Sequence, residues 1–167
     1  MSHEAVRYTF TDKAADYALL ARDLQSLLAG EPDLIANAAN TAALIFEAVP
    51  RLNWVGFYFL KDRELVVGPF QGKPACVRIP LGKGVCGTAA ARRTTLVVAD
   101  VHAFAGHIAC DAASRSEIVI PLATDVSLLG VLDIDSPERD RFDAADQHGL
   151  EALARIFLDS ARSGATR

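Results

Sequence analysis

The sequence of 167 residues lacks the features that mark several large classes of protein. No apolar run approaches the roughly 20 residues of a transmembrane helix, so we expect no membrane partner. No basic stripe occurs and the formal net charge is −4, which argues against a nucleic-acid partner held by phosphate contacts. The N-terminal segment MSHEAVRYTF has no apolar core of the kind found in signal peptides. We therefore expect a cytoplasmic protein.

Cysteine is also scarce, with three residues in the chain: Cys76, Cys86 and Cys110. An odd number in a reducing compartment argues against a structural disulfide framework. A zinc site built from these cysteines with His102 and His107 is disfavoured because no paired C-x₂-C spacing is present, and we expect no bound metal. Two interpretations stay open: buried small hydrophobic residues, or a redox group in which a sulfenic acid condenses with a second thiol.

What the sequence has is the pattern of one globular α+β domain, with 51% hydrophobic and 23% charged residues. Helical spacing of apolar residues predicts terminal helices, with Thr11 as the first N-cap and Pro32 in the first turn of the second helix. Short segments rich in β-branched and aromatic residues predict about six strands between them. The helices are expected over 10–30, 31–50, 82–93 and 141–162, and the strands over 53–60, 64–70, 74–81, 94–100, 116–123 and 127–135.

This order of elements predicts a mainly antiparallel six-stranded sheet. The N- and C-terminal helices should pack on one of its faces, and a ligand pocket should lie on the other.

Two aromatic residues point to that second face. Trp54 and Tyr58 alternate with apolar residues and flank Gly56 on the same face of the first predicted strand. A glycine between two rings leaves a hollow in which a small apolar group can sit. An aromatic pair that simply fills the core is the competing interpretation.

Three carboxylates share a similar placement. Asp133 and Asp135 lie on one face of the last predicted strand, and Glu117 interrupts an otherwise apolar strand. If they meet in one pocket, repulsion and burial raise at least one pKa, so the group can bind a cation and also supply a proton. A solvated strand face near a turn is the alternative.

Two cysteines have neighbours that favour a thiolate. Cys86 lies near the start of a predicted helix beside Lys83, and both the helix N-terminus and the cation favour the charged form. Cys110 lies in an irregular loop over 101–115 with His107 nearby, and a loop of this length is usually functional.

The segments NWVGFYFL, GPFQGKPACVRIPLGKGVCGTAAA, DVHAFAGHIACDAASRSEIVIPL and GVLDIDSP closely resemble the free methionine-R-sulfoxide reductases, a family built on a single GAF domain. The resemblance extends from about Tyr8 to Ser160. It implies one GAF-like domain over 1–167, with a core of about 8–160. It also implies an enzyme that reduces the R epimer of free methionine sulfoxide.

The resemblance further implies how the cysteines act. Cys110 is the nucleophile and is left as a sulfenic acid, and Cys76 or Cys86 then forms a disulfide with it. Thioredoxin reduces that disulfide, with NADPH-dependent thioredoxin reductase as the source of electrons and no bound cofactor.

The pocket residues also receive roles from the resemblance. Glu117, Asp133 and Asp135 match the family's carboxylate cluster, in which one group protonates the sulfoxide oxygen and the others hold the substrate ammonium. Trp54 and Tyr58 are expected to contact the S-methyl group.

Two alternative functions and one oligomeric state are also considered. A GAF domain can serve as a non-catalytic ligand sensor, and the same cysteines can serve a redox sensor without sulfoxide turnover. GAF domains commonly dimerise through their terminal helices, so a homodimer is also expected.

Overall fold

The computed structural model describes residues 8–164; of the predicted single domain, residues 1–7 and 165–167 lie outside this range. The helices are α1 (Lys13–Leu28), α2 (Leu34–Ala48), α3 (Gly84–Arg92) and α4 (Ala144–Gly164), with a short 3₁₀ helix η1 (Val101–Ala103). The strands are β1 (Trp54–Lys61), β2 (Glu64–Gly72), β3 (Arg78–Pro80), β4 (Leu96–Val98), β5 (Ser116–Ala123) and β6 (Leu128–Ser136).

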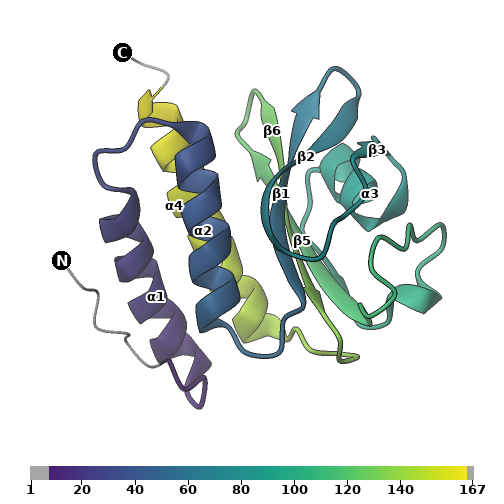
Figure 1. The fold of residues 1–167 in the computed structure, drawn as a ribbon, viewed down its shortest axis with the longest axis horizontal. Helices are drawn as coiled ribbons and strands as arrows, with labels where there is room; N and C mark the ends of the chain where they lie inside the picture. Colours follow the sequence, from purple (N-terminus) through teal and green to yellow (C-terminus); the bar gives the residue numbers. More distant parts are fainter. Residues whose placement is uncertain (1–7, 165–167) are drawn as a thin grey trace.

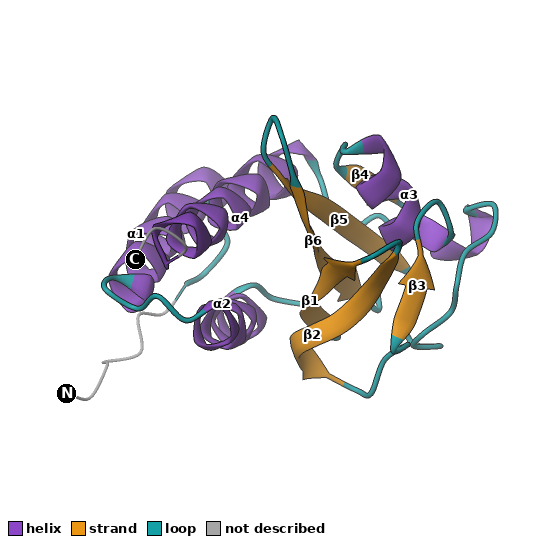
Figure 2. Cartoon of the chain, turned by 90° about the horizontal axis from the view of Figure 1, so that it is seen from above, coloured by secondary structure: helices purple, strands orange, loops and turns teal. Residues whose placement is uncertain are grey.

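The strands form one six-stranded sheet in the order β3-β2-β1-β6-β5-β4, and every neighbouring pair is antiparallel. Helices α2 and α4 cover one face of this sheet, with α1 packed on their outer side, and α3 with its adjoining loops covers the other face (Figure 1). Seen from above, α1 and α4 lie side by side, and α3 lies across the sheet from them (Figure 2). The predicted fold class and the separation into two faces are confirmed.

The core under the three long helices follows the strand alternation. Val55, Phe57 and Phe59 of β1 point into it, as expected from the period of two. Phe57 contacts Phe157 of α4, with the ring centroids 4.4 Å apart. The other face of β1 contributes to a second apolar cluster beneath α3, so the same strand supports both layers.

Several predicted boundaries were wrong. Asp12 caps α1 in place of Thr11, because its carboxylate accepts a hydrogen bond from the Ala15 amide at 3.2 Å. Asp33 caps α2 in the same way, which leaves Pro32 before the helix and not in its first turn. The third predicted strand, 74–81, is limited to Arg78–Pro80 in the structure, so Cys76 lies in the loop before it.

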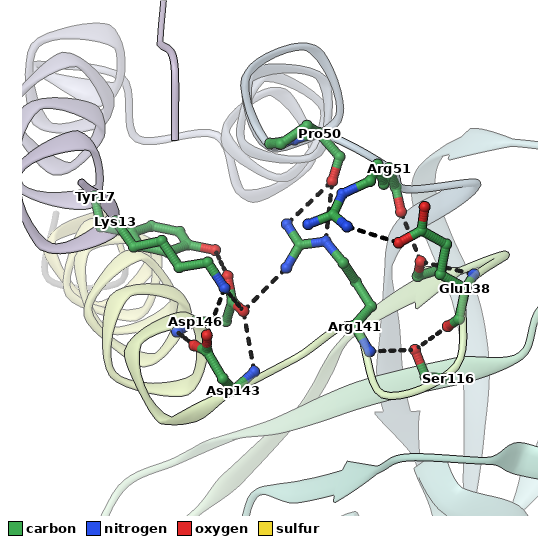
Figure 3. Close-up of polar contacts among 10 residues, drawn as sticks. Lys13, Tyr17, Pro50, Arg51, Ser116, Glu138, Arg141, Asp143 and Asp146 are labelled. Carbon is green, nitrogen blue, oxygen red and sulfur yellow. Dashed lines mark hydrogen bonds and ion pairs between the residues drawn. The ribbon is translucent and has the colours of Figure 1, made fainter. Parts of the chain in front are cut away.

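A buried polar network joins the helical layer to the sheet (Figure 3). The side chain of Arg141 is fully buried; it donates to Asp146 at 2.9 Å and to the Pro50 carbonyl at 3.0 Å. The Arg141 amide donates to Ser116 Oγ at the first residue of β5. Lys13 of α1 also pairs with Asp146, at 2.7 Å. The network thus ties α1, α2 and α4 to the strand that carries one of the predicted site carboxylates.

Among residues 8–164, no helix combines the length and the apolar character needed to cross a lipid bilayer.

Candidate active site

The register of the central strands brings the three predicted carboxylates to one face. Asp133 of β6 lies opposite Gly56 of β1 and Val119 of β5, while Asp135 lies opposite Glu117. Because side chains alternate along a strand, all three carboxylates point away from the long helices. All three line one cavity on the α3 side of the sheet.

This cavity is small, with a volume of about 30 Å³. A volume of that size holds one or two water molecules. Strands contribute its floor, and α3 and the loop before β5 contribute its walls. It is lined by Tyr58, Ile79, Gly84, Val85, Cys86, His107, Ile108, Cys110, Asp111, Ser114, Glu117, Asp133 and Asp135.

Burial raises the pKa of the three carboxyl groups that the strands contribute to the cavity. Burial first, and the charge of Asp133 second, raise the pKa of Glu117 well above its ordinary value. Burial likewise raises the pKa of Asp133 to about 7 and that of Asp135 well above its usual range. The Oδ1 atoms of both aspartates are buried without a hydrogen-bond partner among the described residues. The site is therefore suited to holding a transferable proton and to receiving a donor or cation.

One imidazole faces this cluster. His107 Nε2 lies 3.8 Å from Glu117 Oε2. Burial lowers the pKa of His107, which favours the neutral ring.

The predicted nucleophile is bonded to one of its predicted partners. Cys76 and Cys110 form a disulfide with their Cα atoms 5.4 Å apart. The bond closes the wall of the cavity and connects the loop after β2 to the loop before β5. The structure therefore brings together a redox-capable cysteine pair and the acidic floor.

The third cysteine behaves differently from the prediction. Cys86 is free and buried in α3, where its Sγ lies within 4.8 Å of a carboxylate oxygen of Asp133. Burial, reinforced by the charge of Asp133, raises the pKa of Cys86 well above its ordinary value. The prediction of a Cys86 thiolate was wrong, because Lys83 is exposed and desolvation outweighs the helix N-terminus.

The two predicted aromatic residues lie against each other. The rings of Trp54 and Tyr58 are buried and stacked, with centroids 5.8 Å apart. The hollow predicted over Gly56 is absent, because a Cβ there would come within 2.4 Å of the Trp54 ring. The ring of Trp54 itself fills that space.

Only one of these rings reaches the cavity described above. Tyr58 lines it and donates from its hydroxyl to the Cys76 carbonyl at 3.1 Å. Trp54 is not among the lining residues, and its indole donates to the Lys73 carbonyl at 3.0 Å. Contact between Trp54 and a substrate stays a prediction.

Comparison with known proteins places this site in a family. A GAF domain model matches residues 15–157. The free methionine-R-sulfoxide reductase of Escherichia coli is 56% identical over 142 residues, which are 85% of this chain and 86% of that protein. The chain belongs to the free methionine-R-sulfoxide reductases.

Solved structures agree with this assignment. The crystal structure of the reductase from Neisseria meningitidis in complex with its substrate is 46% identical and superposes with a TM-score of 0.91 over 96% of this chain and 97% of that one. The reduced form of the Staphylococcus aureus reductase is 54% identical, with a TM-score of 0.84 over 87% of this chain and 94% of that one. As a member of this family, the chain is an enzyme, an oxidoreductase.

The reductase also has site residues that the sequence analysis missed. Asn53 precedes β1 and donates to Asp111 Oδ2 at 3.1 Å and to Ser114 Oγ at 3.0 Å. Both acceptors line the cavity and lie in the segment directly after Cys110. Asp111 also accepts from the Ala113 amide at 2.8 Å. The sequence D-A-A-S after the cysteine is a recognisable turn signal, but its partner at Asn53 is distant in the chain.

Proposed function

We propose that this protein reduces free L-methionine-R-sulfoxide to methionine by thiol chemistry. The observation that carries the proposal is the position of the Cys76–Cys110 disulfide at the wall of a cavity whose floor carries three carboxyl groups. A redox-active thiol and a protonated acid in one cavity are the two groups that sulfoxide reduction requires. The names of the relatives support the substrate class.

In the first step, the thiolate of Cys110 attacks the sulfur of the sulfoxide. The protonated oxygen is then transferred to Cys110 Sγ, which becomes a sulfenic acid that keeps the proton. The sulfur–oxygen bond of the substrate and the transient bond between the two sulfurs break, and methionine leaves as the sulfide. The substrate sulfur gains two electrons and Cys110 loses two. A sulfoxide oxygen leaves poorly until it is protonated, and a carboxyl group with a raised pKa supplies that proton near neutral pH.

The three carboxyl groups divide two tasks in this scheme. One of Glu117, Asp133 and Asp135 donates the proton, and the others, once ionised, hold the ammonium group of the amino acid. An ammonium donor would also satisfy the unpartnered Oδ1 atoms of the aspartates. Selection for the free amino acid follows, because a peptide-bonded nitrogen carries no positive charge.

In the second step, the thiol of Cys76 attacks the sulfenic acid of Cys110 and water leaves, which forms the disulfide. We propose thioredoxin as the reductant of this bond, supplied by NADPH through thioredoxin reductase. The Cys76–Cys110 pairing supports Cys76 as the resolving cysteine. A resolving role for Cys86 stays a prediction, since this thiol is free and buried.

The disulfide form must open before a new substrate binds. A cavity of about 30 Å³ is far smaller than an amino acid. Reduction of the disulfide releases the loop that carries Cys110 from the loop that carries Cys76. We expect the released loop to move outward and admit the substrate.

The test of this proposal is the Cys110→Ser variant in an assay coupled to thioredoxin, thioredoxin reductase and NADPH. We expect turnover of free methionine-R-sulfoxide to fall to background, with binding of the sulfoxide retained. A redox or ligand sensor would show binding but no turnover even in the unmodified protein, which would overturn the proposal.

Two further expectations accompany the proposal. Because thioredoxin works in a reducing compartment, we place the protein in the cytoplasm. Homodimerisation through α1 and α4 stays a prediction, and sedimentation equilibrium tests it.

A further inference from the structure

Three potential metal ligands converge at the floor of the cavity. Cys86 Sγ and one carboxylate oxygen each from Glu117 and Asp133 all lie within 4.8 Å of one another. They come from α3, β5 and β6, of which β5 and β6 are neighbouring strands of the sheet. This set of ligands differs from the histidines and cysteines that the sequence analysis considered for zinc, because it consists of one thiol and two carboxyl groups.

A second observation points to a ligand at this position. Asp133 is 8% exposed, yet its Oδ1 has no hydrogen-bond partner among the described residues. A buried carboxylate oxygen without a partner costs free energy unless a donor or a cation meets it. In the described part of the chain, the imidazole of His107 is the one basic side chain that lines this cavity.

The chemistry of the donors selects the ion. A thiolate with two carboxylates is a set that Zn²⁺ accepts, in a four-coordinate site with its last position left to water. Ligands of such a site lie roughly 3–4 Å apart, given metal–ligand distances of about 2.0–2.3 Å. A small closure of α3 toward the sheet therefore suffices. Mg²⁺ and Ca²⁺ prefer oxygen ligands and are disfavoured by the sulfur.

We propose that the disulfide form of this protein binds one Zn²⁺ ion through Cys86, Glu117 and Asp133. Cys86 binds as the thiolate, and its proton passes to the solvent as the zinc–sulfur bond forms. The site needs neither methionine sulfoxide nor turnover, so it goes beyond the proposed function. If that function also holds, the ion occupies the position of the substrate ammonium and zinc inhibits the enzyme.

The disulfide form offers a direct spectroscopic test with Co²⁺ as the probe. Cys76 and Cys110 are bonded to each other, so Cys86 is the one free thiol of the chain. A thiolate-to-cobalt charge-transfer band in the near ultraviolet therefore reports Cys86 alone. We expect this band to saturate at one equivalent of Co²⁺ and to be bleached by one equivalent of Zn²⁺.

Variants then test the ligands by calorimetric titration with Zn²⁺ alone. Cys86→Ser and Asp133→Asn should each weaken binding by about tenfold or more, and Cys86→Ser should also abolish the cobalt band. The control is His102→Gln, whose side chain is 58% exposed and does not line the cavity; its affinity should be unchanged. Absence of the band in the unmodified protein, or equal zinc affinity in Cys86→Ser, would overturn the proposal whether or not the protein reduces sulfoxides.

Discussion

At the scale of single residues, the chemistry of the site follows from desolvation more than from any pairing. Asp133 lies between two neighbouring strands with its Oδ1 unpartnered, and burial raises its pKa to about 7. The sheet therefore holds a carboxyl group in a place that favours its neutral form. That arrangement lowers the stability of the fold at neutral pH, and it fits the proposed role of this group as an acid.

The first residue-scale prediction concerns Asp133→Asn in the disulfide form. A group whose pKa is raised by folding stabilises the fold when protonated, and this contribution is lost as pH rises from about 4 to about 7. Removing the ionisable group should raise the melting temperature by several degrees at about pH 8 and by much less at about pH 4. Thermal unfolding across this range measures the effect.

The control for that measurement is Asp125→Asn, at an exposed position between β5 and β6. Its melting temperature should change by little at either pH, because an exposed carboxylate pays almost no desolvation cost. A pH-independent effect of Asp133→Asn would contradict the account of the buried carboxyl group.

A second residue-scale prediction separates the two chemical steps. Cys76→Ser keeps Cys110, the proposed nucleophile, but removes its partner in the disulfide. We expect a single turnover that releases one methionine per enzyme, followed by a strong loss of thioredoxin-coupled turnover. Quantifying methionine in the absence of reductant measures the first step. Unchanged steady-state turnover would show that Cys76 is not the resolving cysteine.

At the scale of elements, the contact between α1 and α4 depends on a missing side chain. Gly149 of α4 lies against Tyr17 of α1, and a Cβ at this glycine would come within 2.2 Å of the ring. The ring cannot retreat easily, since its hydroxyl donates to the buried Asp146 at 2.9 Å. Helix packing here is set by one glycine.

We therefore predict that Gly149→Ala destabilises the protein by about 1–3 kcal/mol. Alanine normally favours a helix over glycine by about 1 kcal/mol, so the sign is opposite to that of helix propensity. Urea denaturation measures the change. His148→Ala, at the exposed neighbouring position of the same helix, is the control and should be neutral or slightly stabilising.

The elements also show how far sequence patterns reach. The alternation of side chains along a strand correctly predicted that Phe57 faces the long helices and that the carboxylates face the other side. The face on which a strand residue lies depends only on the local period of two. The prediction of a low pKa for Cys86 was wrong. The position of Cys86 near a helix start can be predicted from the local sequence, but its burial beside Asp133 depends on residues distant in the chain. The link from Asn53 to Asp111 could not be predicted, because the two residues are 58 positions apart in the chain.

At the scale of the whole molecule, one buried network holds the helical layer to the sheet (Figure 3). Arg141 has no exposed side-chain surface and bonds both Asp146 and the Pro50 carbonyl. Loss of the Arg141 guanidinium leaves the Pro50 carbonyl without its donor and removes one of the two cations that pair with the fully buried Asp146, the other being Lys13. Breaking buried polar contacts of this kind costs far more than breaking an exposed pair. The network should therefore set global stability.

We therefore predict that Arg141→Met lowers the free energy of unfolding by about 3 kcal/mol or more. The matched control is Arg51→Met, because the Arg51 side chain is 53% exposed and pairs with the side chain of Glu138, which is 47% exposed. That loss should stay below about 1 kcal/mol. Urea unfolding of both variants checks the difference, and equal losses would contradict a global role for the buried network.

We propose above all that the cavity binds the free amino acid and that the protein reduces its sulfoxide. The most direct measurement follows NADPH oxidation through thioredoxin reductase and thioredoxin with three substrates in parallel: free methionine-R-sulfoxide, its S epimer and the N-acetylated R sulfoxide. The account predicts turnover of the free R form alone. Absence of turnover with all three, after the thiols are shown to be reduced, would contradict it, and so would equal turnover of the N-acetylated form.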